Sequence, residues 1–142
     1  MTDTALKSMY VLMLAGLVAL VFAAAPAPAA AQLAGSAWTA REVNGDPVPD
    51  GLPVFLRFAE DGASGAGGCN RFTGGYAESG EALALGPFAA TRMACTGPAM
   101  DVEAAFFDAL QATRSYRRDA AGLELLDEDG EVLAAFAARP YE

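Results

Sequence analysis

Apolar and polar residues alternate along most of the chain beyond residue 32, in short segments that end at glycine-containing turns. In residues 54–58, for example, Val54, Leu56 and Phe58 occupy every second position. Alternation with a period of two predicts strands, and short strands separated by turns at intervals of about ten residues predict an antiparallel arrangement. The sequence therefore predicts a fold of the α+β class that is mostly β: a small antiparallel sheet or barrel-like meander packed with one α-helix.

Turn dipeptides such as Asn44-Gly45 and Asp61-Gly62 mark where the strands end. We expect strands over residues 36–43, 54–58, 63–68, 76–79, 82–85, 123–126 and 132–137. All but the first pair in chain order as three hairpins, and Gly86-Pro87 is expected to break the second. The last strand has small or apolar residues at every position, so we expect it to lie centrally with both faces covered.

One stretch has the period of a helix instead. Val102, Phe106 and Leu110 recur at a spacing that places them on one helical stripe. Pro98 suits a first helical turn, and the acidic residues that follow it lie near the positive end of the helix dipole. We expect one amphipathic helix over about residues 98–112, whose apolar stripe seals an open face or end of the sheet.

The first 31 residues differ from the rest. Lys7 precedes an uninterrupted apolar run over residues 9–25, and small residues follow as far as Ala31. This is the layout of a cleaved secretory signal peptide, and an uncleaved membrane anchor is the alternative. We expect residues 1–31 to be removed, leaving a single soluble domain over residues 32–142 that is periplasmic or secreted. The junction lacks a cysteine for lipidation, so we expect no stable membrane insertion after cleavage.

Charge and composition exclude several classes of function. The 142 residues include 9 basic and 18 acidic side chains and no histidine, which gives a formal net charge of −9. Such a balance argues against a nucleic-acid partner, because phosphate binding needs a basic face. The absence of histidine removes the Ser/His/Asp and Cys/His catalytic arrangements and every histidine-containing metal site. We expect no enzyme activity, no cofactor and no metal.

The two cysteines, Cys69 and Cys95, both fall in the part of the chain that is expected to be exported. An even count in an oxidising compartment allows one disulfide between them. A pair of buried free thiols is the alternative.

Two further runs of residues allow more than one interpretation. The glycine-rich run over residues 67–76 lacks the Lys-Ser/Thr of a phosphate-binding loop, so a tight, disulfide-pinned turn is favoured over a ligand site. The acidic run over residues 127–131 suggests calcium, but Leu125 and Phe136 occupy positions where an EF-hand needs oxygen ligands. A solvated hairpin turn is favoured there.

Two short blocks carry a family resemblance. They are Gly68-Cys69-Asn70-Arg71-Phe72-Thr73-Gly74 and Thr91-Arg92-Met93-Ala94-Cys95, with Trp38 upstream and Glu103 downstream. Together, and at this separation, the blocks resemble the META domain of the heat-shock protein HslJ family. The resemblance covers nearly all of residues 33–138.

The resemblance implies a small exported domain of bacterial envelopes, built from antiparallel strands with one helix and associated with heat or antibiotic stress. It also implies that the shared motif residues are structural: Trp38, Asn70, Arg71, Phe72, Thr91, Arg92, Met93 and Glu103. We expect Arg92 or Arg71 to pair with Glu103 beside the disulfide, because a partly buried guanidinium needs a carboxylate. Exposed, solubilising arginines are the alternative.

Three functions are compatible with these features of the chain. The favoured one is a non-catalytic envelope-stress or interaction domain with an envelope protein as its partner. The first alternative is a module that binds a small ligand or lipid, which would need a pocket instead of a filled core. The second is a histidine-free hydrolase, which would need two carboxylates in one cleft.

Overall fold

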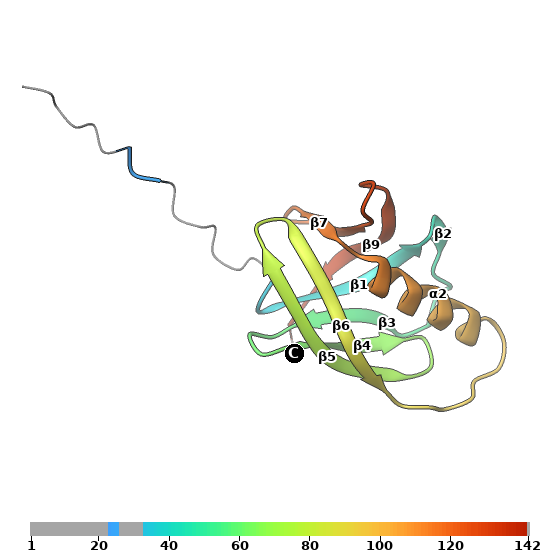
Figure 1. Cartoon of the computed structure of the whole chain (residues 1–142). Coiled ribbons are helices and arrows are strands. Elements are labelled where there is room, and N and C mark those ends of the chain that lie inside the picture. Colours follow the sequence, from blue (N-terminus) through green and yellow to red (C-terminus); the bar gives the residue numbers. More distant parts are fainter. Residues whose placement is uncertain (1–22, 26–32, 142) are drawn as a thin grey trace, which may run out of the picture.

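The computed structural model describes residues 23–25 and 33–141, and the second range forms a sheet with one helix (Figure 1). The predicted signal peptide over residues 1–31 lies outside the described residues except for 23–25. The elements are β1 (Ser36–Val43), β2 (Asp46–Pro47), β3 (Val54–Phe58), β4 (Ala63–Gly67), β5 (Arg71–Ser79), β6 (Ala82–Ala90), α2 (Pro98–Ala112), β7 (Ser115–Arg118), β8 (Gly122–Leu126) and β9 (Val132–Arg139). The expected mostly β fold with one helix is confirmed.

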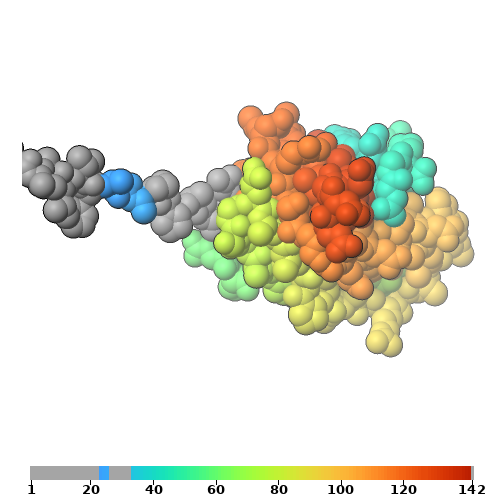
Figure 2. All heavy atoms as spheres, turned by 45° about the horizontal axis from the view of Figure 1, so that its top comes forward, coloured from blue at the N-terminus to red at the C-terminus, as the bar shows by residue number. Residues whose placement is uncertain are grey.

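The strands form a closed ring. Each pairs antiparallel with its neighbour in the order β2-β1-β3-β4-β5-β6-β7-β8-β9, and β9 pairs back onto β1. Figure 2 shows the segments around β2 (cyan) and around the β8–β9 turn (red) close together on one face, although they are far apart in the sequence. The weakest point of the ring lies between β6 and β7, whose register holds the single pair Ala82 and Ser115.

Alternate residues of the strands point into the ring and fill it. Phe58, Phe72, Leu56 and Leu125 are each at most 1 % exposed. Phe72 lies at the centre of an aromatic group, with ring centroids 5.0 Å from Phe88, 6.0 Å from Phe106 and 5.4 Å from Phe107. The interior is therefore a packed core.

Helix α2 covers one opening of the ring. Phe106, Ala109 and Leu110 are buried on its inner stripe, as the sequence pattern predicts. The helix contacts β4 and β6 on one side of the ring and β1, β8 and β9 on the other. It ends at Ala112, and the hydroxyl of the capping residue Thr113 donates to the carbonyl of Ala109. Its bounds match those expected from the sequence.

The middle hairpin departs from expectation. Strand β5 begins at Arg71, five residues earlier than predicted, and β6 continues through Gly86-Pro87 to Ala90. The dipeptide does not break the strand, because the register shifts there in a β-bulge that accommodates a residue without an N–H. Hairpin β5–β6 is consequently the longest in the ring.

Three further strands differ from expectation. The short strands β2 and β7 were not predicted, because both residues of β2 are exposed and only Tyr116 of the four residues of β7 is buried. Strand β9 does lie between two neighbours, but its outer residues stay partly exposed while Ala134 and Phe136 are buried. One face of β9 is therefore covered instead of two. Within residues 23–25 and 33–141, no helix is long and apolar enough to cross a bilayer.

Candidate functional site

The two motif blocks meet at one end of α2. The first block forms the turn between β4 and β5 and the start of β5, and the second forms the loop between β6 and α2. A disulfide joins them: Cys69 and Cys95 are bonded, with their Cα atoms 6.0 Å apart. The expected pairing of the cysteines is present.

Glu103 of α2 lies beneath this junction and is 5 % exposed. Its Oε1 accepts the backbone N–H groups of Asn70 and, at 3.3 Å, of Cys69. Its Oε2 accepts the side-chain amide of Asn70 at 2.7 Å. A buried carboxylate with three N–H donors is stabilised by charge-assisted hydrogen bonds and needs no cation beside it.

A glycine makes room for this carboxylate. A Cβ added to Gly67 would lie 2.8 Å from Cγ of Glu103, closer than real Cβ atoms approach another atom. The missing side chain therefore lets α2 approach β4 closely. This explains one glycine of the run that the sequence marks as unusual.

Asn70 uses its whole side chain in the same network. Its Oδ1 accepts the hydroxyl of Thr91 at 2.9 Å and the N–H of Met93 at 2.6 Å. Its Nδ2 donates to the carbonyl of Met93 at 3.2 Å as well as to Glu103. A carboxamide has two acceptor and two donor positions, so all four are occupied.

Thr91 extends the network to the next strand. The N–H of Arg71 donates to Oγ1 of Thr91 at 3.1 Å, and the N–H of Thr91 donates to the carbonyl of Arg71 at 3.0 Å. We call Glu103, Asn70, Thr91 and the Cys69–Cys95 disulfide the motif network. It ties the turn, the loop and the helix together.

The expected ion pair between Glu103 and an arginine is wrong. Arg71 and Arg92 are both exposed, and the described residues hold one ion pair, between Arg117 and Glu124 at 2.9 Å. The reason lies in strand alternation: Phe72 points into the core, so Arg71 must point outward while Glu103 points inward. Backbone and amide N–H groups take the place that we expected a guanidinium to fill.

Comparisons with known proteins place the chain in a family. The META domain family matches residues 31–140. The chain belongs to this family. A protein from Burkholderia xenovorans, solved by NMR, is 31 % identical with a TM-score of 0.63, covering 82 % of this chain and 93 % of its own.

Two further solved structures are similar. One, also an NMR structure, is 28 % identical with a TM-score of 0.60 and covers 75 % of this chain and 92 % of its own. A DUF4847 family protein from Bacteroides vulgatus is 17 % identical with a TM-score of 0.51, covering 78 % of this chain and 96 % of its own, and shows the fold alone. No curated protein matches at a significant level.

The remaining motif residues of this META domain have separate places. Trp38 is 2 % exposed, and its Nε1 donates to the hydroxyl of Ser36 at 2.8 Å, outside the motif network. Phe72 belongs to the aromatic core. Met93 contributes backbone groups to Asn70, while its side chain is 55 % exposed. Among the motif residues, Arg71, Thr91, Arg92 and Met93 are therefore exposed to solvent.

Sequence reasoning missed a second polar contact inside the ring. The hydroxyl of Tyr116 donates to Oε1 of Glu78, and the N–H of Leu33 donates to Oε2 at 3.4 Å. Burial, together with this hydrogen bond, raises the pKa of Tyr116 well above its usual value. Nothing in the sequence pattern pointed to this pair, because Tyr116 lies in the unpredicted strand.

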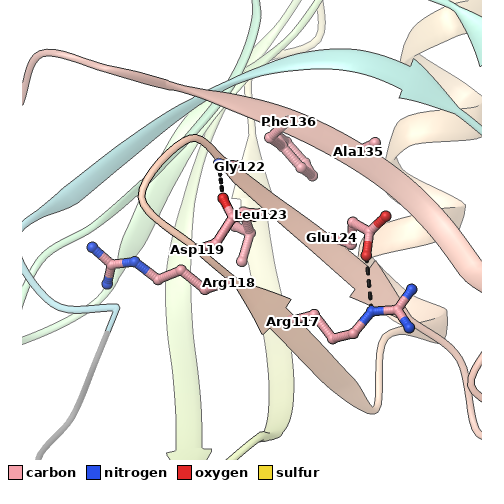
Figure 3. A pocket seen from close by; sticks show the side chains of 8 residues that line it. All are labelled: Arg117, Arg118, Asp119, Gly122, Leu123, Glu124, Ala135 and Phe136. Atoms are coloured by element: carbon pink, nitrogen blue, oxygen red, sulfur yellow. Dashed lines mark hydrogen bonds and ion pairs between the residues drawn. The ribbon is translucent and has the colours of Figure 1, made fainter.

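Two hollows on the described surface differ in their lining. The hollow of about 440 Å³ between β7, β8 and β9 contains Arg117 and Glu124, which pair with each other, and Asp119, which accepts the N–H of Gly122 at 2.8 Å (Figure 3). An apolar hollow of about 500 Å³ lies between β6 and α2 and is lined by Leu85, Phe88 and Phe107 among others. In the part of the chain that the structure describes, no three His, Cys, Asp or Glu side chains gather as metal ligands.

Proposed function

We propose that this META domain is a non-catalytic, exported domain of the bacterial envelope that acts in envelope stress by presenting its outer surface to a protein partner. The observation that carries the proposal is the motif network. Asn70 has all four hydrogen-bonding positions occupied, and the buried Glu103 has three donors. These polar groups serve to hold the scaffold: the Asn70 amide has no free position for a substrate, and the Glu103 carboxylate uses three of its about four acceptor positions.

The filled interior supports the same proposal. Phe58, Phe72 and Phe106 occupy the centre of the ring and are each at most 1 % exposed. A domain whose interior is packed interacts through its outside. The disulfide between Cys69 and Cys95, and the apolar leader in the sequence, both favour an oxidising compartment outside the cytoplasm.

A second candidate function is binding of a small apolar ligand or a lipid chain. The hollow lined by Leu85, Phe88 and Phe107 favours it, because its volume of about 500 Å³ falls in the range of small-molecule sites. It lies outside the ring, between β6 and α2. A histidine-free hydrolase has no comparable support, because Glu103 is engaged by its three donors.

Chemical cross-linking in the bacterium that encodes the chain tests the proposal. The full-length chain with a C-terminal tag is expressed, cross-linked, purified and examined by mass spectrometry, with an unrelated tagged protein carrying residues 1–31 as the control. We expect one envelope protein to be enriched over that control. Recovery of the domain alone contradicts the proposal, and co-purification of a lipid lost on Phe107→Ser supports the second candidate.

A further inference from the structure

The outer face of β9, β1, β3, β4 and β5 has an unusual composition. Register pairs align its outward residues in two adjacent rows across the five strands. The rows contain three arginines, Arg139, Arg57 and Arg71, together with Phe55 and otherwise only alanine, serine and threonine. We call this surface the arginine face.

Charge is segregated on this face. The chain has twice as many acidic as basic residues, yet the two rows hold no carboxylate. Among the described residues, the single ion pair is formed elsewhere, by Arg117 and Glu124. Within the five strands, carboxylates stand only near strand ends, at Glu42 of β1 and at Glu78 of β5. The three arginines thus present a local positive surface on an acidic domain.

Aromatic rings hold two of the guanidinium groups in place. Arg139 lies over Phe55, 4.5 Å from the ring centroid, and Arg57 lies over Tyr141 at 4.8 Å. Nε of Arg57 is buried and has no hydrogen-bond partner among the described residues. Stacking on a ring uses the face of a guanidinium and leaves its terminal Nη groups at the edge for a carboxylate, and the orientation of the group costs little further entropy.

We propose that the arginine face docks a short acidic segment of a protein partner, with carboxylates bound by Arg139, Arg57 and Arg71. This inference rests on the proposed function and identifies the surface that carries it. The three arginines lie on β9, β3 and β5, which span four strand spacings, or about 20 Å. An extended segment of about six residues covers that length.

The negative charge of the rest of the domain favours a short acidic segment over a long one. An anionic membrane or a long polyanion would extend past the face and meet the acidic remainder of a chain whose net charge is −9. Screening at physiological salt acts over about 8 Å, so charges just beyond the face still repel. A segment of about six residues contacts the arginines alone.

An NMR titration of the purified, isotope-labelled protein tests the inference. The probe is a capped octapeptide of glycine and serine with glutamates at positions 2, 5 and 8, and the matched peptide has glutamine at those positions. We expect the acidic peptide alone to shift backbone amides of β1, β3, β4, β5 and β9, with binding that weakens as salt is raised. The Arg57→Gln/Arg139→Gln variant should weaken binding at least tenfold, and the control Arg41→Gln/Arg114→Gln should change it less than twofold.

Arg71→Gln is the second variant, because Arg71 is exposed. We expect it to weaken binding about three- to tenfold with an unchanged spectrum of the free protein. Three results overturn the inference: shifts outside the five strands, equal binding of the two peptides, or tighter binding of phosphatidylglycerol vesicles through the same arginines. If cross-linking still enriches a partner with the Arg57→Gln/Arg139→Gln variant, the partner binds elsewhere on the domain. The inference about the arginine face then fails, and the proposed function stands.

Discussion

Replacing Glu103 by glutamine tests whether the motif network stabilises the fold through its charge. The substitution keeps the shape of the side chain, removes the negative charge and turns one acceptor oxygen into an NH₂ donor. Oε1 and Oε2 both accept N–H groups, so glutamine must direct its NH₂ at a donor in either orientation. Asn70 cannot relieve the clash by turning its amide, because its NH₂ would then face the N–H of Met93.

The expected loss of stability in Glu103→Gln follows from these contacts. A hydrogen bond to a charged group contributes about 1.5–3 kcal/mol, and a neutral one about 1 kcal/mol. Glutamine at residue 103 loses one bond outright and weakens two others, so we expect the free energy of unfolding to fall by about 3 kcal/mol. Small domains have about 5–15 kcal/mol in total, which makes this loss easy to measure.

Urea unfolding followed by the fluorescence of Trp38, with the disulfide intact, is the assay. Asp108→Asn is the matched control, because Asp108 lies exposed on the same helix and loses the same charge. The control should stay within about 0.5 kcal/mol of the wild type. A Glu103→Gln variant that also stays within about 0.5 kcal/mol at an unchanged denaturant slope would refute the reasoning.

Three other perturbations have defined outcomes. Cys95→Ser should cost ~3.5 kcal/mol on the chain-entropy model for a separation of 26 residues, and an unchanged urea midpoint would contradict it. Gly67→Ala should lower the free energy of unfolding by about 1–3 kcal/mol, because the added Cβ crowds Glu103. Gly75→Ala should lower it less, because the space around the Cβ position of Gly75 is open. Equal urea midpoints of the two variants would show that α2 moves freely. Burial and the hydrogen bond to Glu78 raise the pKa of Tyr116, so the folded state resists ionisation of this side chain. The free energy of unfolding should therefore fall as pH rises above about 10, and it should fall less steeply in Tyr116→Phe. Parallel pH profiles of the two proteins would contradict this.

The sequence predicted most elements because their buried faces are regular. Strand β3 and helix α2 have the bounds expected from alternation and from the helical stripe. Strand β7 was missed because its buried surface is concentrated in one residue, Tyr116. The extension of β6 was missed because a bulge at Gly86-Pro87 depends on the partner strand, which local sequence does not describe.

The candidate site was predicted in composition but not in pairing. The motif blocks brought Asn70, Thr91 and Glu103 to attention, and the structure places all three in one network. Their partners could not be derived, because several of the donors are backbone N–H groups whose direction depends on the turn between β4 and β5. A rule that pairs buried charges with opposite charges overlooks such donors.

Double-mutant cycles test whether Glu103 is held by an arginine, as the sequence suggested, or by Asn70, as the structure shows. If an arginine supported the carboxylate, Arg92→Ala and Glu103→Gln would show a coupling energy well above about 0.5 kcal/mol. The exposed position of Arg92 predicts a coupling within about 0.3 kcal/mol of zero. The cycle between Asn70→Ala and Glu103→Gln should instead give about 1–3 kcal/mol, because each residue is the other's hydrogen-bond partner. A large coupling to Arg92 together with a negligible one to Asn70 would mean that the carboxylate faces the loop and not the glycine turn.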